Sequence, residues 1–271
     1  MTPGDQAAVV AARRGVRVAE LDTIADFQRV VRLFDHIWHP EPWNPPMTVE
    51  LMRALSHTGN YVAGAFDGGD LVGAAAGFLA APAGRVLHSH VAGAVRPGAG
   101  FALKLHQRAW ALGHGISRIT WTFDPLVRRN AHFNLAKLGA LPEDYMPGFY
   151  GPMGDAVNAG DESDRVLAVW RLEDPRVAEA CGGVPYRPRI PRDAVTGLAL
   201  REGRPVAGPS GGRVVLVALP EDIEALRRED PEAAKEWRHA VRDVLGGLMA
   251  EGARVAGFTG GHYVVERPGG R

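Results

Sequence analysis

The sequence contains a single cysteine, Cys181, among its 271 residues. One cysteine cannot form an internal disulfide, and a chain without a second thiolate has no cysteine cluster for zinc. Free cysteine is among the residue types most often buried in proteins. We therefore favour a buried, small apolar role for Cys181 over the alternative role of catalytic nucleophile.

An excess of charge of one sign and a long apolar run are also missing. Lys+Arg and Asp+Glu both number 31, so the chain lacks the surplus of basic residues on which nucleic-acid binding depends. No stretch approaches the ~18 apolar residues of a membrane span. The short apolar run near the N-terminus has its arginines after it, whereas a secretory signal carries its charge before it. We expect a cytoplasmic bacterial protein with no nucleic-acid or membrane partner.

What the sequence does contain is typical of a globular protein with mixed secondary structure. Hydrophobic residues make up 46% and charged residues 23% of the chain. Alternating and helical apolar patterns predict a first domain over residues 1–175, in which a meander of strands leads into a βαβ unit. The expected strands cover residues 15–21, 61–66, 71–81, 86–95, 116–123 and 165–172, and the expected helices begin at Thr23, Thr48, Gly98 and Val127.

Residues 176–271 are predicted to form a smaller α/β unit after a segment rich in proline. Its expected strands cover 195–200, 213–219, 253–258 and 262–266, and a long helix is expected over about 220–251. The second half of this helix carries an apolar stripe at helical spacing, formed by Trp237, Val241, Val244, Leu245 and Leu248. A stripe of this width predicts burial against the rest of the protein or a second subunit.

A glycine-containing turn joins the strand at 86–95 to the following helix. Gly98 and Gly100 lie in this turn. Because glycine has no side chain, nothing at these two positions covers the backbone N–H groups at the start of the helix. Such a helix N-terminus suits an anionic phosphate. A tight turn that binds no ligand is the alternative interpretation.

Two histidines precede this turn. Strict alternation along the strand places His88, His90, Ala92 and Ala94 on one face. A neutral histidine can take a proton from an amine near pH 7, which makes His88 and His90 candidate bases, with structural core histidines as the alternative. A zinc site formed by both histidines with His36 or His39 is less favoured, because no carboxylate or cysteine signature accompanies them.

Three further residues have competing interpretations. Asp124 follows a predicted strand and precedes a predicted helix, so a helix cap is favoured over a catalytic role. Trp38 and Trp43 flank the proline-rich loop at 39–46, where they either line an acceptor pocket or anchor the loop on the core.

Several motifs together resemble the Gcn5-related N-acetyltransferase (GNAT) superfamily of acyl-CoA-dependent acyltransferases. The resemblance covers roughly residues 15–172 and is closest to a subgroup of predicted acyltransferases associated with N-acylamino acid racemases. The segments that carry it are Ala102–Leu105, Ile119–Leu126, Arg129–Ala140, Phe149–Gly151, Ser163–Arg165 and the region from Glu221 to Asp243. The resemblance implies a mixed-sheet GNAT acyltransferase fold with a smaller appended C-terminal α/β unit.

The resemblance also implies where coenzyme A binds. Gly98 and Gly100 match the glycines of the superfamily motif, but Val95 stands where the motif has Gln or Arg, and Arg96 lies one place away. The turn is about four residues shorter than usual. The implied cofactor-binding residues are Ala94, Val95, Arg96, Gly98, Ala99, Gly100, Phe101, Ala102 and Asn130, the last of these at a position that commonly contacts the pantetheine arm.

The tyrosine that often protonates the departing thiolate is replaced in this sequence. Its position is occupied by Leu135, and Tyr145 and Tyr150 lie downstream, where a tyrosine or a water molecule can substitute. We predict His88, His90 and Tyr150 as the catalytic residues, and no metal.

The function implied is transfer of an acyl group, acetyl or succinyl, from coenzyme A to the amine of a small molecule or amino acid. One alternative is an acyltransferase whose donor is the thioester of an acyl carrier protein. Another is a catalytically degenerate GNAT-fold binding module. The amphipathic helix in the appended unit favours a homodimer.

Overall fold

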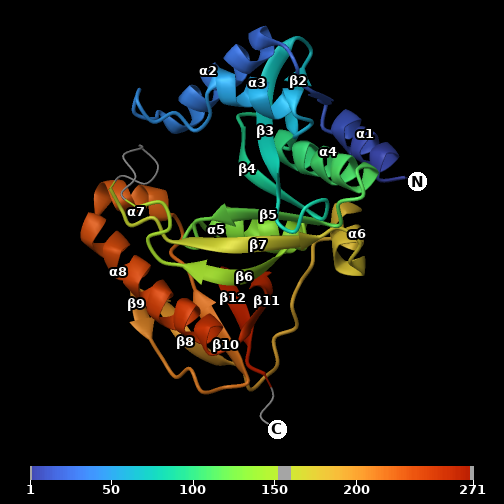
Figure 1. Ribbon diagram of the computed structural model, residues 1–271. Coiled ribbons are helices and arrows are strands. Elements are labelled where there is room, and N and C mark those ends of the chain that lie inside the picture. The colour runs from blue at the N-terminus through green and yellow to red at the C-terminus, as the bar shows by residue number, and fades with distance from the viewer. Residues whose placement is uncertain (1, 152–159, 269–271) are drawn as a thin grey trace. The chain divides into compact units, whose positions relative to one another are not determined.

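The structure, a computed structural model, describes residues 2–151 and 160–268 (Figure 1). The chain divides into two compact units, residues 1–121 and 122–271. Each unit combines helices with strands that form both parallel and antiparallel pairs. The predicted mixed α/β class is therefore confirmed. None of the described helices is both long enough and apolar enough to cross a membrane.

The division into compact units does not coincide with the predicted domains. Residues 122–175 belong to the second unit, because strand β6 (Leu141–Met146) packs against strand β11 (Arg254–Thr259) near the C-terminus. The assignment of an acyltransferase domain to residues 1–175 stays a prediction.

The first unit contains nine of the elements that the structure describes. In chain order they are α1 (Pro3–Arg13), β1 (Arg17–Glu20), α2 (Ile24–Trp38), α3 (Val49–His57), β2 (Val62–Asp67), β3 (Asp70–Ala80), β4 (Val86–Ala94), α4 (Ala99–Gly113) and most of β5 (Arg118–Phe123). The side chains of Thr23 and Thr48 accept the backbone N–H groups of Asp26 and Leu51 as helix N-caps, which confirms that helices begin at both residues. Helix α1 was not predicted, although Thr2 and Asp5 form a capping box there.

The strands of this unit lie in the order β1-β2-β3-β4-β5. The first four are antiparallel neighbours, and β4 runs parallel to β5. Figure 1 shows α2 and α3 on one side of these strands and α4 on the other. Phe27, Phe34 and Met52 of the first pair form a core with Ala74 and Ala76 of β3.

Strand β4 contains a β-bulge at His90. Ala76 and Gly77 are consecutive on β3, whereas their partners on β4 are Val91 and Ser89, so His90 is the extra residue. The bulge reverses the alternation that the sequence predicts beyond this point. The contacts on the two faces of β4 show this reversal. The prediction that His88, His90, Ala92 and Ala94 share one face is therefore wrong.

These contacts involve both helix layers of the first unit. Val91 packs on the core formed with α2 and α3, and a Cβ at Gly93 would lie 2.7 Å from Trp38 of α2. Ala94 faces the other side of the sheet, toward α4, because a Cβ added at Gly100 of α4 would lie 4.0 Å from the Cβ of Ala94. Trp38 consequently anchors α2 on β4, whereas Trp43 is 78% exposed.

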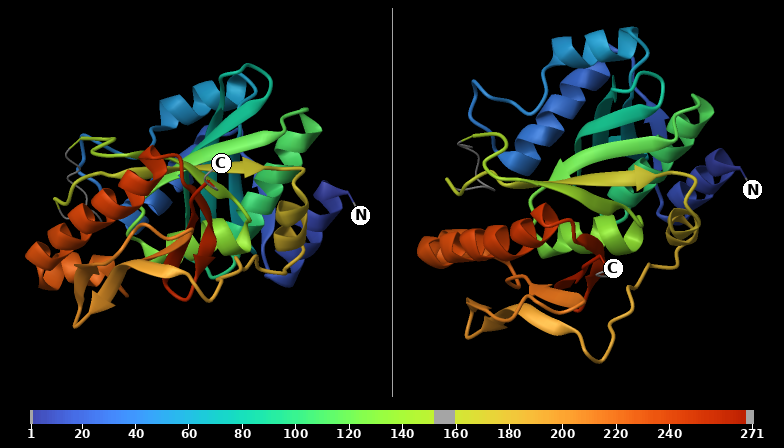
Figure 2. Two further views of the ribbon diagram at one scale, coloured as in Figure 1. Left: turned by 90° about the horizontal axis from the view of Figure 1, so that it is seen from below. Right: turned by 60° about the horizontal axis from the view of Figure 1, so that its bottom comes forward.

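The second unit completes β5 and contains the remaining elements. In chain order they are α5 (Arg128–Ala131), the π-helix η1 (His132–Lys137), β6, β7 (Arg165–Arg171), α6 (Pro175–Cys181), β8 (Val195–Arg201), β9 (Arg204–Ala207), β10 (Val214–Ala218), α7 (Ile223–Glu229), α8 (Pro231–Val241), the π-helix η2 (Arg242–Gly246), α9 (Gly247–Ala250), β11 and β12 (His262–Glu266). Five strands form a sheet in the order β11-β12-β10-β8-β9. Figure 2 shows α8 lying over this sheet, where it contacts β9.

The long helix predicted over 220–251 is interrupted. Asp230 ends α7, and its side chain accepts the N–H of Ala233 to cap α8, which begins at Pro231. Four members of the predicted apolar stripe are buried, whereas Val244 is only half-buried. Cys181 is buried on α6, which confirms its apolar role.

Candidate functional site

The glycine turn forms the N-terminus of α4. Gly98 is the N-cap in the left-handed region with φ of 89°, and no side chain of the described residues hydrogen-bonds to the first N–H groups of the helix. No acidic residue lies in the first turn. In the part of the chain that the structure describes, the nearest atom to an added Cβ at Gly100 is Cβ of Ala94, at 4.0 Å. The positive end of the helix is therefore open to an anion.

Two arginines lie beside this turn. A Cβ at Gly98 would come within 2.8 Å of Cδ of Arg14, and a Cβ at Gly15 would come within 2.8 Å of the guanidinium of Arg96. Arg96 also forms an ion pair with Asp67. Glycine at both positions therefore lets the arginine side chains approach, and their charge adds to the helix dipole at the turn.

The predicted donor-binding residues of the first unit follow one another at the end of β4 and the start of α4. The side chains of Ala99 and Ala102 are fully buried, so only their backbone can face a ligand. Val95 is 48% exposed, and Ala94 and Phe101 are half-buried. Their roles in binding stay predictions.

The two candidate bases contact the same aromatic ring. The rings of His88 and His90 lie 5.2 and 5.8 Å from that of Phe78, measured between centroids. Nδ1 of His88 lies 3.1 Å from Oγ1 of Thr120, and His90 is exposed at the bulge. Burial lowers the pKa of both histidines, and the charges of His90 and Lys104 lower that of His88 further. Both rings are therefore mainly neutral near pH 7 and able to accept a proton.

A buried lysine on α4, Lys104, contacts strand β4. Nζ of Lys104 donates to Oγ of Ser89 at 2.9 Å and to Oε1 of Gln107 at 3.1 Å. It also lies 4.0 Å from the ring centroid of Trp121. Burial lowers the pKa of Lys104 to about 7. The sequence contained this lysine within the motif Ala102–Leu105, but a charged residue in an apolar helix gave no sign that it was buried.

A metal site with histidine ligands finds no support in residues 2–151 and 160–268. No group of three or more His, Cys, Asp or Glu side chains there is arranged to hold a metal ion. The rings of His36 and His39 lie 6.3 Å apart, beside each other at the end of α2.

The third predicted catalytic residue, Tyr150, belongs to the second unit. Its hydroxyl lies 2.9 Å from Oγ1 of Thr122 at the end of β5, and the side chain is 42% exposed. Asn130 is half-buried in α5. Leu135, which occupies the position of the usual tyrosine, is fully buried in η1.

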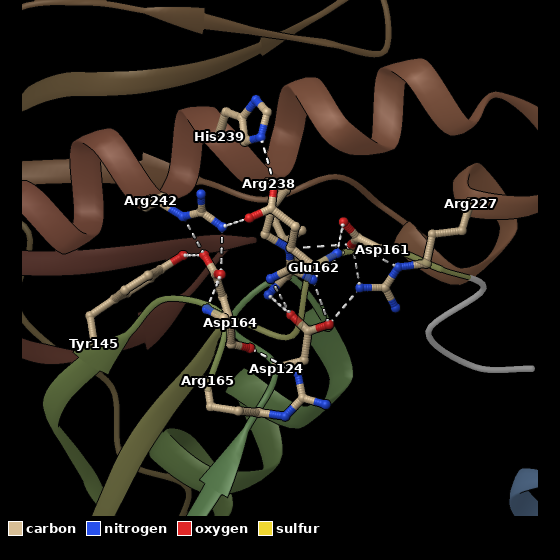
Figure 3. A network of polar contacts seen from close by, with 12 residues as sticks. Asp124, Tyr145, Asp161, Glu162, Asp164, Arg165, Arg227, Arg238, His239 and Arg242 are labelled. Carbon is tan, nitrogen blue, oxygen red and sulfur yellow. Dashed lines mark hydrogen bonds and ion pairs between the residues drawn. The ribbon is translucent and has the colours of Figure 1, made fainter. Parts of the chain in front are cut away.

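Asp124 is not the N-cap of the following helix, although its Oδ1 accepts the backbone N–H of Leu126 at 2.9 Å in the turn before that helix. The N-cap of α5 is Val127, whereas the Asp124 carboxylate accepts hydrogen bonds from Arg227 at 2.5 Å and from Arg238 at 2.9 Å (Figure 3). Asp161 accepts from the same two arginines at 2.9 and 2.8 Å. All four side chains are at least nine-tenths buried, and we call them the ionic quartet.

The quartet has strong electrostatic consequences. Burial alone would raise the pKa of Asp124, but the guanidiniums of Arg238 and Arg227 outweigh it and hold that pKa well below its ordinary value. Burial likewise lowers the pKa of Arg238, and Asp124 and Asp161 reverse the effect and raise it. These pairs leave no local signal in the sequence, because their members are separated by up to 114 positions.

No protein-family model matches the chain, and none of the curated proteins matches it. Its neighbours among solved structures are GNAT-family acetyltransferases. A GNAT-family acetyltransferase of Streptococcus pneumoniae is 15% identical with a TM-score of 0.45, over 57% of this chain and 98% of that chain. The ribosomal-protein-S18-alanine N-acetyltransferase of Escherichia coli is 15% identical with a TM-score of 0.46, over 59% and 95%. The protein yncA of Salmonella typhimurium, in a structure with its cofactor acetyl-CoA, is 16% identical with a TM-score of 0.47, over 60% and 98%.

Proposed function

We propose that the protein transfers an acyl group, acetyl or succinyl, from coenzyme A to the amine of a small molecule or amino acid. The observation that carries the proposal is the uncapped N-terminus of α4, which follows the bulged strand β4 through Gly98. Open helix N-termini bind phosphate groups, and coenzyme A presents a diphosphate. The motif resemblance to the GNAT superfamily supports the same chemistry, and its racemase-associated subgroup supports an amino acid as acceptor and succinyl as one donor group.

The residues at the turn fit such a diphosphate. Gly100 leaves open space where a larger residue would project a side chain, and the first turn of α4 carries no competing carboxylate. The side chain of Arg14 passes next to Gly98 and supplies positive charge. We assign the backbone of Gly98–Ala102 to donor binding and Asn130 to the pantetheine arm.

Coenzyme A supplies an activated thioester, and the protein must provide a proton acceptor for the attacking amine. We propose His90 for this role and His88 as the second candidate. His90 is exposed at the bulge and makes no polar contact with a described residue, whereas His88 is held by Thr120. The lowered pKa of each ring keeps it neutral at pH 7. Tyr150 is the proposed proton donor to the departing thiolate.

One observation favours an alternative donor. Arg96 pairs with Asp67, and the short turn places no further glutamine or arginine at the motif position. A carrier-protein thioester has the phosphopantetheine arm of coenzyme A but lacks its adenosine 3′,5′-bisphosphate, and would need fewer phosphate contacts. A binding module without catalysis is the remaining alternative.

Isothermal titration with coenzyme A and a thioester-cleavage assay with a panel of amines test the proposal. We expect micromolar binding, and in Gly100→Val a donor affinity at least ~10-fold weaker, equivalent to about 1.4 kcal/mol. Gly113→Val is the matched control, because this glycine at the other end of α4 has open space around it. Absence of binding would contradict the proposal. Turnover with a loaded carrier protein would then favour the second donor, and no turnover would favour the binding module.

A further inference from the structure

The segment that carries Tyr150 is fixed by two buried residues just before β7. The N–H of Phe149 donates to the backbone oxygen of Ser163 at 3.1 Å. The N–H of Tyr150 donates to the side-chain Oγ of the same serine at 3.0 Å. Asp164 accepts the N–H of Gly148 on Oδ1 at 2.9 Å. Ser163 and Asp164 are 1% and 0% exposed. Three successive N–H groups, those of residues 148–150, are therefore all bound by one pair of residues.

Asp164 is itself held from the C-terminal part of the chain. Arg242 donates from Nε to Oδ2 at 2.9 Å and from a terminal nitrogen to Oδ1 at 2.6 Å, a bidentate pair (Figure 3). The hydroxyl of Tyr145 donates to Oδ2 at 2.8 Å. Burial would raise the pKa of Asp164, but the hydrogen bonds from Arg242, Gly148 and Tyr145 together outweigh it and lower that pKa, so the carboxylate stays ionised at neutral pH.

The local backbone explains how Arg242 reaches this position. It is the first residue of the π-helix η2, and such π-turns within helices often occur at functional sites. Gly246 of the same π-helix lies against Tyr145, since an added Cβ there would be 3.2 Å from that ring. Arg242 also contacts Glu162, a half-exposed residue whose loss would leave the pair with Asp164 intact.

The side chain of Tyr150 has two contacts of its own. Its hydroxyl lies 2.9 Å from Oγ1 of Thr122, and the guanidinium of Arg165 lies 5.4 Å from its ring centroid. The ring is thus placed by Thr122 and Arg165, and its backbone by Ser163 and Asp164. A tyrosine that was only a surface residue would not require these four partners, three of which, Ser163, Asp164 and Arg165, are buried.

We infer that Arg242 is a positioning residue for Tyr150, acting through Asp164. The inference rests on the proposed function, in which Tyr150 donates the proton to the leaving thiolate. It means that the C-terminal helices contribute to acyl transfer without touching the substrate. A displacement of about 1 Å at a catalytic group can reduce a rate by about 100-fold, so release of residues 148–150 is expected to lower kcat.

The first measurement does not depend on activity. Hydrogen exchange of the amides of residues 148–150 is compared in the wild type, Arg242→Gln and the control Glu162→Gln. We expect exchange to accelerate at least ~10-fold in Arg242→Gln and to stay unchanged in Glu162→Gln. The melting temperature identifies a variant that has unfolded, and Arg242→Lys, which keeps the charge but loses the bidentate geometry, then provides a milder test. Unchanged exchange in folded Arg242→Gln, or in folded Arg242→Lys where Arg242→Gln does not fold, would overturn the inference.

The second measurement is kinetic. Arg242→Gln and Tyr150→Phe are each expected to lower kcat by ~10- to 100-fold with the KM for the donor unchanged. The double variant should be no slower than Tyr150→Phe alone, because both changes remove the same contribution. Arg242→Lys, which keeps the charge but not the bidentate geometry, should restore part of kcat.

The outcomes separate the inference from the proposed function. If the wild type transfers no acyl group, the proposed function fails, and accelerated exchange in Arg242→Gln then shows that the support of Tyr150 exists without that reaction. If the wild type is active and Tyr150→Phe is slow, but Arg242→Gln keeps full kcat, positioning by Arg242 is overturned while the proposed function stands. A multiplicative loss in the double variant would overturn the inference as well.

Discussion

Arg238 donates two hydrogen bonds of 2.9 Å to the carboxylate of Asp124, across 114 positions of the sequence. Asp124 follows the last residue of β5, and Arg238 lies on α8. Through this pair and the other members of the ionic quartet, the C-terminal helices of the second unit hold the segment that follows β5. Breaking a buried pair on one side leaves an uncompensated charge, which costs about 3–5 kcal/mol.

Asp124→Asn should therefore lower the free energy of unfolding by about 3–5 kcal/mol near pH 7. The pKa of Asp124 is depressed in the folded state, so its contribution is present above the ordinary aspartate pKa of about 4 and is lost as pH falls below it. Urea unfolding across pH 2–7 should show this acid loss in the wild type and a smaller one in the variant. Asp243→Asn, at an exposed position on η2, is the control. Equal stability of Asp124→Asn and the wild type would contradict a stabilising quartet.

Truncation after Asp174 should give an insoluble or unstable fragment. It removes Arg227, Arg238 and Arg242, and so takes from the buried carboxylates of Asp124 and Asp164 the arginines that form ion pairs with them. Size-exclusion chromatography and thermal unfolding of the fragment provide the measurement. A soluble, monomeric and fully active fragment would show that residues 175–271 form an independent module.

Trp237→Ala should destabilise the full chain by about 3–5 kcal/mol. The side chain is fully buried, and its indole nitrogen donates to the backbone oxygen of Gly203 at 2.9 Å. The change leaves a cavity and an unpaired acceptor. Trp43→Ala removes the same side chain from an exposed loop and should change the stability by less than about 0.5 kcal/mol. Equal effects of the two substitutions on chemical unfolding would refute a core role.

The free energy of unfolding of the wild type should rise with pH above pH 7, and Lys104→Met should remove this rise. The folded-state pKa of Lys104 is about 7, below the value of an unfolded lysine, so the unfolded state binds more protons above pH 7. Stability should therefore increase in the wild type by on the order of 1 kcal/mol per pH unit between about pH 7 and pH 10. Lys137→Met, an exposed control, should keep this slope. NMR titration should also show a higher pKa for His88 in Lys104→Met, because a nearby positive charge is gone.

His90→Ala should lower kcat by ~100-fold or more without weakening donor binding, if His90 is the base. The wild-type rate should fall as the pH drops below the histidine pKa, which burial holds under its ordinary value of about 6.5. His88→Ala is the parallel test for the second candidate, and His57→Ala, exposed on α3, is the control. Full activity and an unchanged pH profile in both variants would leave water as the proton acceptor.

The sequence by itself determined the elements whose signals are local. Thr23 and Thr48 mark helix starts because a hydroxyl caps the N–H groups of its own helix, and Gly98 marks the turn before α4 because a positive φ suits glycine. The apolar stripe through Trp237 similarly predicted burial from spacing alone.

Tertiary structure decided the rest, because the deciding contacts join residues far apart in the sequence. The bulge at His90 depends on the pairing of β3 with β4 and reverses the faces that alternation predicts. The burial of Lys104 depends on Ser89 and Trp121, and the role of Asp124 depends on arginines more than 100 positions away. Long-range charge pairing leaves no periodic signal in a sequence, so only the folded chain shows which carboxylate each arginine neutralises.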